Sequence, residues 1–367
     1  MPISIGPLDG VRVVDVTGIE GAYVGRLLSD LGASVVRVRH SVDGLDSWPE
    51  HVRLFMEAGK TEVAVELQSS AFHRRLGSAD VLVTAGGPDR LRAVGIHPEL
   101  TTADRPSLVH TNISAYGLTG PFADRPHSDL TRLAAGGLLY LAGDPDREPV
   151  RPFPEQSSMA ASLHATVATL MAVRRADRTG AGDVVDVSVQ EAVAHSVENA
   201  VQTLDLEGRT RTRVGAGPVE AGTGLFRCSD GWVYLVTSIG GKRLRWDELV
   251  EWMCADEAVG AAGLASDIWT DPDFVRSAEG VDAFRDVAET FMRDRTKREL
   301  YEEGQRRGIS IAPVSSAADL LENPQLAAME FFSTRVAADG ASYEFPGAPY
   351  RFSGTSVGPR TADGVAS

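Results

Sequence analysis

The stretch VRVVDVTGIEGAYVGRLLSDLGASVVRVR, residues 11–39, decides the fold. Its first six residues (11–16) form an apolar, β-branched run that predicts a buried strand, and residues 33–39 predict a second one. Between them a helical pattern begins at Gly21 and stops at Gly32. A strand, a helix and a strand in this order form a βαβ unit, in which the two strands are parallel.

The same alternation continues through the first 115 residues. Helical patterns lie between several further strand candidates, which are EVAVEL (62–67), DVLVT (80–84) and SLVHTNIS (107–114). Strands that alternate with helices predict an α/β fold with a mostly parallel sheet.

The pattern changes twice in the rest of the chain. Residues 129–206 are mainly helical in pattern, whereas residues 222–238 contain two β-rich runs around a Ser-Asp-Gly hairpin signal. Residues 296–299 (TKRE) fit a capping box at the start of a helix. We therefore expect a large domain from residues 1–208 and a smaller α+β domain from residues 215–310.

Composition limits the class of protein. The chain has 367 residues, of which 43% are apolar and 24% charged, with a formal net charge of −15. This charge argues against nucleic acid or an anionic membrane surface as the main partner, although a local patch can still bind an anionic small molecule. Two cysteines and no cluster with metal-ligand spacing indicate neither a disulfide framework nor a metal site. Without a signal peptide or a run of 18 apolar residues, we expect a cytoplasmic protein.

The loop after the first strand is rich in glycine. The spacing of Gly18, Gly21 and Gly25 does not fit the dinucleotide motif, and the second strand ends in Arg37 and Arg39 rather than in an acidic residue. This pattern argues against a nicotinamide cofactor and suits an anionic ligand, whose phosphate the helix start could hold.

One histidine stands close to a carboxylate. His127 precedes Asp129 by two residues, so it is a candidate general base, while the alternative is that Ser128 or Asp129 caps the following helix. His110, in a strand, and His164, on a helix, are interpreted as packed side chains.

Two adjacent serines stand where a polar segment meets a long apolar helix. Ser157 and Ser158 lack the G-x-S-x-G setting of a hydrolase nucleophile, and Glu155 is the nearest carboxylate. Helix capping alone explains both serines. The residues by themselves therefore indicate a soluble α/β protein with a small-molecule site.

Taken together, several segments resemble the class III CoA-transferases, the family of formyl-CoA transferase, carnitine CoA-transferase and α-methylacyl-CoA racemase. The resemblance covers nearly the whole chain. Its segments, in order, are GPLDGVRVVDVT, GRLLSDLGASVVRVR, TNISAYGLTGPFADRPHSDL, AGDPDREPVR, RRADRTGAGDVVDVSVQEAVA, GISIAPVSSAADLLENPQL and FPGAPYRFSGTS.

The resemblance implies an architecture. It predicts a Rossmann-like large domain built from both chain ends, with the small domain inserted, so that residues 311–367 return to the large domain and end in a tail. It also implies an interlocked homodimer, and coenzyme A or an acyl-CoA as substrate.

The family's transferases use an aspartate that attacks an acyl-CoA thioester and forms a mixed anhydride. By its spacing to LHA (163–165), that aspartate falls on Ser158, so the chain is a divergent member without the usual nucleophile. The histidine of the racemases falls on Ser128, with His127 one residue earlier. The ENFRPG segment of the CoA site is replaced by TAGGPD (84–89).

Four basic residues are the candidates for contact with CoA phosphates: Arg37, Arg39, Lys60 and Arg90. Each is also interpretable as a plain surface charge.

Three hypotheses follow. The first is an enzyme that acts on an acyl-CoA thioester and transfers CoA between carboxylic acids, with Glu155 or Asp129 as the carboxylate and His127 as a base. The second is a binding protein or the non-catalytic subunit of a heteromeric CoA-transferase, whose partner is a complete paralogue. The third is a repurposed lyase or isomerase in which Ser158 hydrogen-bonds the substrate.

Overall fold

The computed structural model describes residues 6–40, 48–197, 199–215, 217, 220–337, 340–358, 360, 361, 364 and 365. Among these residues no helix is both long and apolar enough to cross a membrane. The chain divides into two compact units. The first comprises residues 1–142, 149–211 and 324–367, and the second comprises residues 143–148 and 212–323.

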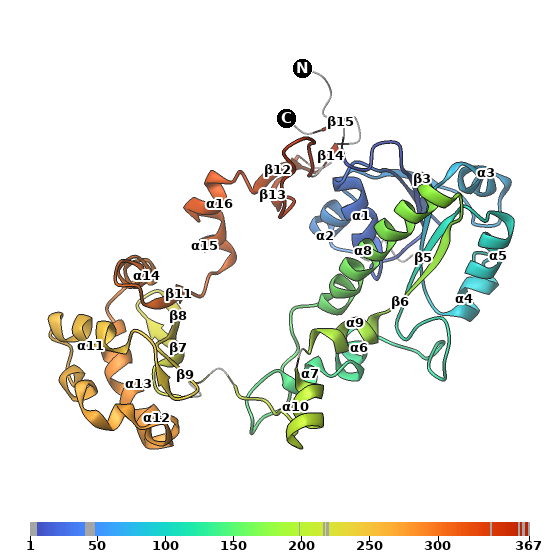
Figure 1. Ribbon diagram of the computed structural model, residues 1–367. Helices are drawn as coiled ribbons and strands as arrows, with labels where there is room; N and C mark the ends of the chain where they lie inside the picture. Colours follow the sequence, from blue (N-terminus) through green and yellow to red (C-terminus); the bar gives the residue numbers. More distant parts are fainter. Residues whose placement is uncertain are drawn as a thin grey trace. The chain divides into compact units, whose positions relative to one another are not determined.

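A six-stranded parallel sheet forms the centre of the first unit (Figure 1). The strands lie in the order β3-β2-β1-β4-β5-β6. Their bounds are β1 (Arg12–Asp15), β2 (Ser34–Arg39), β3 (Thr61–Ala64), β4 (Val81–Ala85), β5 (Val109–Ser114) and β6 (Asp183–Ser188). The predicted α/β class and parallel sheet are confirmed.

Strand β6 interrupts residues 129–206, which the sequence predicted to be mainly helical, and was not predicted. It pairs with β5 from Asp183 opposite Val109 to Ser188 opposite Ser114. Its sequence, DVVDVS, is rich in β-branched residues, and half of its length is exposed at the edge of the sheet. The long helical patterns on both sides of this short run conceal it.

Helices cover both faces of the sheet (Figure 1). Because successive residues of a strand face opposite sides, Val13 of β1 lies in one core cluster with Ala161 and Val14 lies in the other with Phe72. The helices of this unit are α1 (Ala22–Asp30), α2 (Glu50–Met56), α3 (Ser70–Ser78), α4 (Pro88–Ala93), α5 (Pro98–Asp104), α6 (Asp129–Ala135), α7 (Leu138–Leu141), α8 (Gln156–Thr179), α9 (Val189–Ser196), α10 (Ala200–Glu207) and α16 (Pro324–Ala328). Helix α8 packs against α1, β5, β6 and α9. Two short hairpins complete the unit, β12 (Phe332–Val336) with β13 (Ser342–Pro346) and β14 (Arg360–Thr361) with β15 (Gly364–Val365).

The strand order reverses between β1 and β4. In open parallel sheets, ligands bind at such a switch point, in the crevice beyond the carboxyl ends of the strands. The loop after β1 (16–21) and the loop after β4 (86–87) both leave the sheet at this place.

The second unit is built around a small antiparallel sheet. Its elements are β7 (Thr223–Cys228), β8 (Gly231–Val236) and β11 (Ser310–Pro313), the two-stranded pair β9 (Ser238–Ile239) and β10 (Lys242–Arg243), and the helices α11 (Trp246–Ala255), α12 (Pro272–Arg276), α13 (Ala278–Met292), α14 (Lys297–Arg306) and α15 (Ala317–Leu321), with 3-10 turns at Ala261–Ala265 and Asp267–Thr270. The predicted hairpin is present between β7 and β8, and Thr296 and Glu299 form the predicted capping box of α14.

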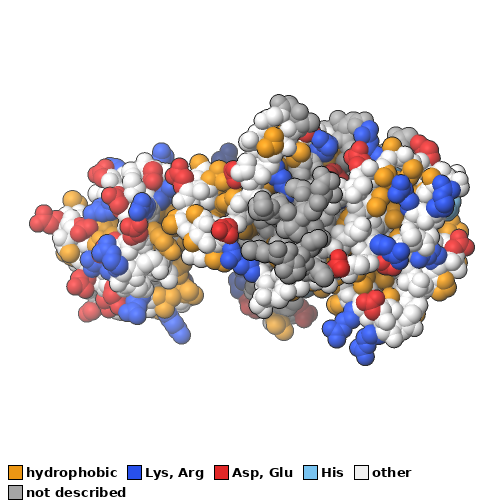
Figure 2. Space-filling model, turned by 90° about the horizontal axis from the view of Figure 1, so that it is seen from above, with side chains coloured by type: hydrophobic (Ala, Val, Ile, Leu, Met, Phe, Trp, Pro, Cys, Tyr) orange, Lys and Arg blue, Asp and Glu red, His pale blue; other side chains and the backbone are white. Residues whose placement is uncertain are grey.

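Buried aromatic side chains, among them Trp246 and Phe284, fill the core of the second unit. Acidic and basic side chains are interspersed on the face of this unit that Figure 2 shows.

A buried ion pair lies under the loop after β1. The Lys60 ammonium contacts Asp15 Oδ2 at 2.9 Å and donates to the Ala22 carbonyl at 2.8 Å, and both charged side chains are fully enclosed. Burial by itself would raise the pKa of Asp15, but Lys60 and Arg37 outweigh it and hold that pKa below its usual value. Gly25 is required here, because a Cβ atom at this position would lie 2.2 Å from Asp15 Oδ2.

We expect the substitution Lys60→Met to lower the free energy of unfolding by about 3–5 kcal/mol, because it leaves the Asp15 carboxylate buried without its partner. Urea unfolding followed by circular dichroism measures the change. The matched control is Lys242→Met at an exposed position of β10, which should change the free energy of unfolding by less than about 0.5 kcal/mol. A loss below about 1 kcal/mol in Lys60→Met would show that the pair contributes little.

A buried histidine links β4, β5 and α5. His110 Nε2 lies 2.9 Å from Thr84 Oγ1, and His110 Nδ1 lies 2.6 Å from Thr101 Oγ1. The Thr84 hydroxyl donates its proton to Asn112, so His110 Nε2 is the donor to Thr84. Burial, with a smaller contribution from the nearby His97, lowers the pKa of His110 to about 3. The interpretation of His110 as a packed side chain agrees with this environment.

This histidine should make the stability of the protein depend on pH. The pKa of His110 is lower in the folded chain than in the unfolded chain, so between these two values unfolding takes up a proton and the folded state loses stability as the pH falls. From about pH 7 to about pH 5.5, His110 alone should lower the free energy of unfolding by about 1 kcal/mol. In His110→Gln this part of the pH dependence should vanish, which urea unfolding at both pH values measures. An equal pH dependence in both proteins would contradict the assignment.

Candidate active site

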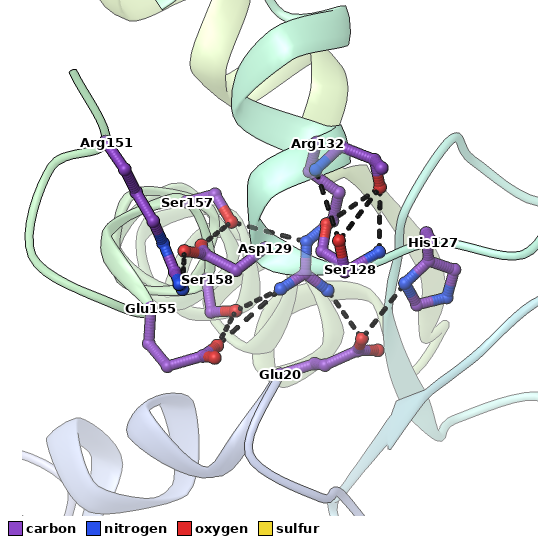
Figure 3. A network of polar contacts seen from close by, with 10 residues as sticks. Glu20, His127, Ser128, Asp129, Arg132, Arg151, Glu155, Ser157 and Ser158 are labelled. Carbon is purple, nitrogen blue, oxygen red and sulfur yellow. Dashed lines mark hydrogen bonds and ion pairs between the residues drawn. The ribbon is translucent and has the colours of Figure 1, made fainter. Parts of the chain in front are cut away.

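Polar side chains from three segments meet beside the loop that follows β1 (Figure 3). They are Glu20 of that loop, His127, Ser128, Asp129 and Arg132 around the start of α6, and Arg151, Glu155, Ser157 and Ser158 before and at the start of α8. The structure thus brings together the four residues predicted as catalytic candidates from the sequence.

The centre of the network is the buried guanidinium group of Arg132, whose side chain is 2% exposed. Its Nη1 contacts Glu20 Oε1 at 2.5 Å and its Nη2 donates to Ser158 Oγ at 3.0 Å. Its Nε donates to Ser157 Oγ at 3.3 Å, and Glu155 Oε2 lies 3.6 Å from Nη2. One positive charge therefore connects the β1 loop to the beginning of α8.

Asp129 is a buried carboxylate whose two oxygens are both occupied. Oδ1 accepts a hydrogen bond from Ser157 Oγ at 2.7 Å, and Oδ2 accepts one from Arg151 at 3.1 Å. Burial alone would raise the pKa of Asp129, but these two hydrogen bonds, together with the backbone N–H of Glu155, hold it below its usual value. Asp129 is thus an ionised group that fixes the start of α8.

Glu155 has a different environment. It precedes α8 with a left-handed backbone conformation, φ 64°, which costs a residue other than glycine about 1–2 kcal/mol. Its side chain is 26% exposed, and its Oε2 accepts a hydrogen bond from Ser158 Oγ at 3.0 Å. Strained residues of this kind cluster at functional sites. Of the two candidate carboxylates, Glu155 is the accessible one.

Ser158 is enclosed between its two partners. Its hydroxyl donates to Glu155 and accepts from Arg132, and the residue is 2% exposed. Neither partner is an imidazole or an amine, the groups that usually remove the proton of a serine nucleophile. Its position suits hydrogen bonding.

His127 pairs with a carboxylate other than the neighbouring Asp129. Its Nδ1 lies 3.3 Å from Glu20 Oε1, the oxygen that Arg132 also contacts. The Ser128 side chain accepts from the Thr131 backbone N–H in a capping box, so Ser128 is the cap of α6.

The four basic candidates lie outside this network, and their exposure differs. Arg37 is fully buried beside Glu57 and the Val38 carbonyl, and Lys60 is held by Asp15. Arg39 is 45% exposed next to Glu62, and Arg90 is exposed on α4. Of these four candidates, only Arg39 and Arg90 are exposed to solvent.

Sequence reasoning missed Arg132, Glu20 and Arg151. Arg132 follows Asp129 by three residues and so faces the same side of α6, which is the one local signal. Its main partner, Glu20, is 112 positions away in the chain, so the pairing has no signature in sequence spacing. Among the described residues, no group of three or more His, Cys, Asp or Glu could hold a metal ion.

Known proteins resemble this chain over nearly its full length. It is 37% identical over 358 residues to the succinyl-CoA:(R)-benzylsuccinate CoA-transferase subunit BbsE of Thauera aromatica, covering 93% of this chain and 87% of that one. It is 26% identical to the succinyl-CoA–L-malate CoA-transferase alpha subunit of Chloroflexus aurantiacus (89% and 78% covered). It is also 25% identical to the succinate–glutarate CoA-transferase of Agrobacterium fabrum (93% and 88% covered).

The fold also has a solved counterpart. The crystal structure of a CAIB/BAIF family protein from Brucella suis superposes with a TM-score of 0.80 at 23% identity, covering 98% of this chain and 97% of that one. The family model for CoA-transferase family III matches residues 8–363. The chain therefore belongs to CoA-transferase family III.

Proposed function

We propose that this protein transfers CoA from an acyl-CoA thioester to a carboxylic acid, with a short dicarboxylic acyl-CoA such as succinyl-CoA as donor. Family membership supports the CoA thioester. The names of the relatives support the donor, because each of the three relatives above is named for succinyl-CoA or succinate.

The proposal assigns the nucleophile to Glu155. The single observation that carries it is the pair of environments described above: Asp129 is buried with both oxygens occupied, whereas the Glu155 carboxylate is accessible and adjoins Ser158, the position of the family's aspartate. The chain is then a divergent member in which the carboxylate has moved by three residues.

The reaction proceeds as an exchange at the Glu155 carboxylate. A Glu155 oxygen bonds to the thioester carbonyl carbon, the C–S bond breaks, and CoA leaves as its thiolate, giving a mixed anhydride. The thiolate attacks the Glu155 carbonyl and releases the donor acid, so that CoA is bound to Glu155 as a thioester. The acceptor carboxylate repeats the two steps in reverse and takes up CoA, which restores Glu155. His127, whose Nδ1 lies 3.3 Å from Glu20 Oε1, is proposed as a base in this site.

The CoA phosphates are proposed to contact Arg39 and Arg90. Both side chains are exposed in the first unit, whereas Arg37 and Lys60 support the loop after β1 from within. CoA is a substrate in this scheme, and the chemistry calls for no metal.

We expect Glu155→Gln to lower the rate of CoA transfer by at least about a thousandfold while the protein stays folded, because the amide oxygen is a poor nucleophile. Transfer from succinyl-CoA to a panel of carboxylic acids, read by chromatography, measures the rate. A stalled reaction should also carry CoA on the peptide that contains Glu155, which mass spectrometry detects. The matched control, Glu148→Gln, changes an exposed carboxylate of the same chain and should leave transfer unchanged. Unchanged turnover in Glu155→Gln would overturn the assignment of the nucleophile, and unchanged turnover in Asp129→Asn as well would exclude both candidate carboxylates.

A second candidate function is the non-catalytic subunit of a heteromeric CoA-transferase. Ser158 at the aspartate position favours it, and so do the relatives, several of which are named as subunits. In that case the purified chain would be inactive alone and would gain activity with a paralogue that keeps the aspartate. Activity of the chain by itself would exclude it.

We propose that the chain forms an interlocked dimer, as a homodimer if it acts alone, with the two domains predicted from the sequence. The two compact units support the domain division. An apolar groove of about 740 Å³ along α8, β6 and α9 supports the dimer, because Leu163, Val167 and Met171 are each more than half exposed there. A set of large apolar side chains of this kind is typical of a protein interface.

We expect Val167→Asp to prevent the dimer from assembling, so that the protein is isolated as single chains, because a buried, unpaired carboxylate opposes association. Light scattering during gel filtration gives the mass. Val259→Asp is the control, since Val259 is 77% exposed but lies in the second unit. A wild-type protein of single-chain mass, or a Val167→Asp protein that remains dimeric, would contradict the proposed interface.

A further inference from the structure

The network around Arg132 contains a binding group that the CoA exchange does not require. We propose that Arg132 binds the second carboxylate of a dicarboxylic substrate, the one that does not react. We further propose that Glu20 occupies this place when no substrate is present. The identity of the substrate rests on the proposed function, but the carboxylate site itself can be tested without any turnover.

The burial of Arg132 requires that its charge be compensated by neighbouring groups. A guanidinium group without contact to water is stable only where carboxylates or other acceptors compensate its charge. Arg132 is 2% exposed, and its closest charged partner is Glu20 Oε1 at 2.5 Å. The planar guanidinium group matches the geometry of a carboxylate, so Glu20 marks a place where a carboxylate is held.

Glu20 is placed so that it can leave Arg132. It lies in a loop, its side chain is 22% exposed, and the same oxygen that contacts Arg132 lies 3.3 Å from His127 Nδ1. His127 is itself 24% exposed, so it offers Glu20 a partner on the solvent side. Exchange of one carboxylate for another keeps Arg132 paired at every stage, and the exchange therefore avoids the cost of a bare buried charge.

The number of charged groups in the network also favours the displacement of Glu20 by a substrate carboxylate. Three carboxylates, those of Glu20, Asp129 and Glu155, face the two guanidinium groups of Arg132 and Arg151. A further carboxylate would add repulsion to a site that already has an excess of negative charge. Asp129 is fixed by Ser157 and Arg151, so Glu20 is the carboxylate that a substrate displaces.

The distance to Glu155 sets the kind of substrate. Arg132 Nη2 lies 3.6 Å from Glu155 Oε2 and 3.0 Å from Ser158 Oγ. A carboxylate bound to Arg132 is therefore close to the proposed nucleophile, and only a few carbon atoms separate it from the reacting carbonyl. This arrangement selects short dicarboxylic acyl groups over monocarboxylic ones of equal length.

The test is calorimetric titration of the purified protein with succinate in the absence of CoA. Succinamide, which has the same shape without charge, is the control ligand. We expect succinate to bind and succinamide not to bind. Arg132→Gln should weaken succinate binding at least about tenfold, the usual effect of losing a hydrogen bond to a charged group. Arg92→Gln, which changes an exposed arginine paired with Asp89, is the matched control and should bind as the wild type does.

A second variant distinguishes a loss of the binding site from a loss of folding in Arg132→Gln. Glu20→Gln removes the internal competitor, so it should bind succinate several-fold more tightly than the wild type. Opposite effects of two substitutions in one contact cannot both come from damage to the fold. Equal succinate affinity in the wild type, Arg132→Gln and Glu20→Gln would overturn the inference.

Kinetics separate this inference from the proposed function. In Arg132→Gln, kcat/KM should fall at least about tenfold more for succinyl-CoA than for butyryl-CoA, mainly through KM. An equal fall for both thioesters would mean that Arg132 serves the reacting carbonyl, and the inference would fail while the transfer function stands. A wild-type protein that binds succinate as described but transfers no CoA would have the opposite meaning: the site stands and the proposed function fails.

Discussion

The buried charge of Arg132 constrains the whole site. A guanidinium group in that position needs carboxylates around it, and the fold supplies them from segments that are distant in sequence: Glu20 after β1 and Glu155 before α8. The same contacts fix where α6, α8 and the β1 loop meet. This junction lies beside the loop that follows β1, the strand at which the sheet order reverses, so the ionic contacts and the parallel sheet together determine the place of the site.

Environment, more than residue type, separates the roles of the two candidate carboxylates. Asp129 accepts hydrogen bonds on both oxygens and has a lowered pKa, which makes it a stable anion and a weak nucleophile. Glu155 has an accessible side chain on a backbone that is held in a left-handed conformation. Asp129 stabilises the start of α8, which directly follows Glu155, by accepting a hydrogen bond from Ser157. A buried, structural carboxylate thus lies close to an accessible one.

Most of the sheet could be predicted from the sequence because its strands are short apolar runs separated by helices, and burial on both faces leaves a plain signal. The edge strand β6 escaped prediction because its alternation of valine with polar residues lies between two long helical patterns. Within the site, the presence of Asp129, Glu155 and Ser158 was predictable, and the partner of His127 was not. Proximity in sequence favours Asp129, but that side chain turns toward Ser157 and leaves His127 to Glu20. Such choices depend on contacts across the fold, which residue spacing does not encode.

The serine at position 158 and the arginine at position 132 explain one another. An aspartate at position 158 would place its carboxylate against Arg132 Nη2, where Ser158 Oγ now lies at 3.0 Å. An ion pair at that distance would stabilise the anion and lower its pKa, which weakens a nucleophile. It would also add a fourth carboxylate to a site that already holds three. A hydroxyl group avoids both effects, since it accepts from Arg132 and donates to Glu155 without adding charge. If the proposed function holds, an arginine that binds a substrate carboxylate and a nucleophile at Glu155 would both follow from the absence of a charge at position 158.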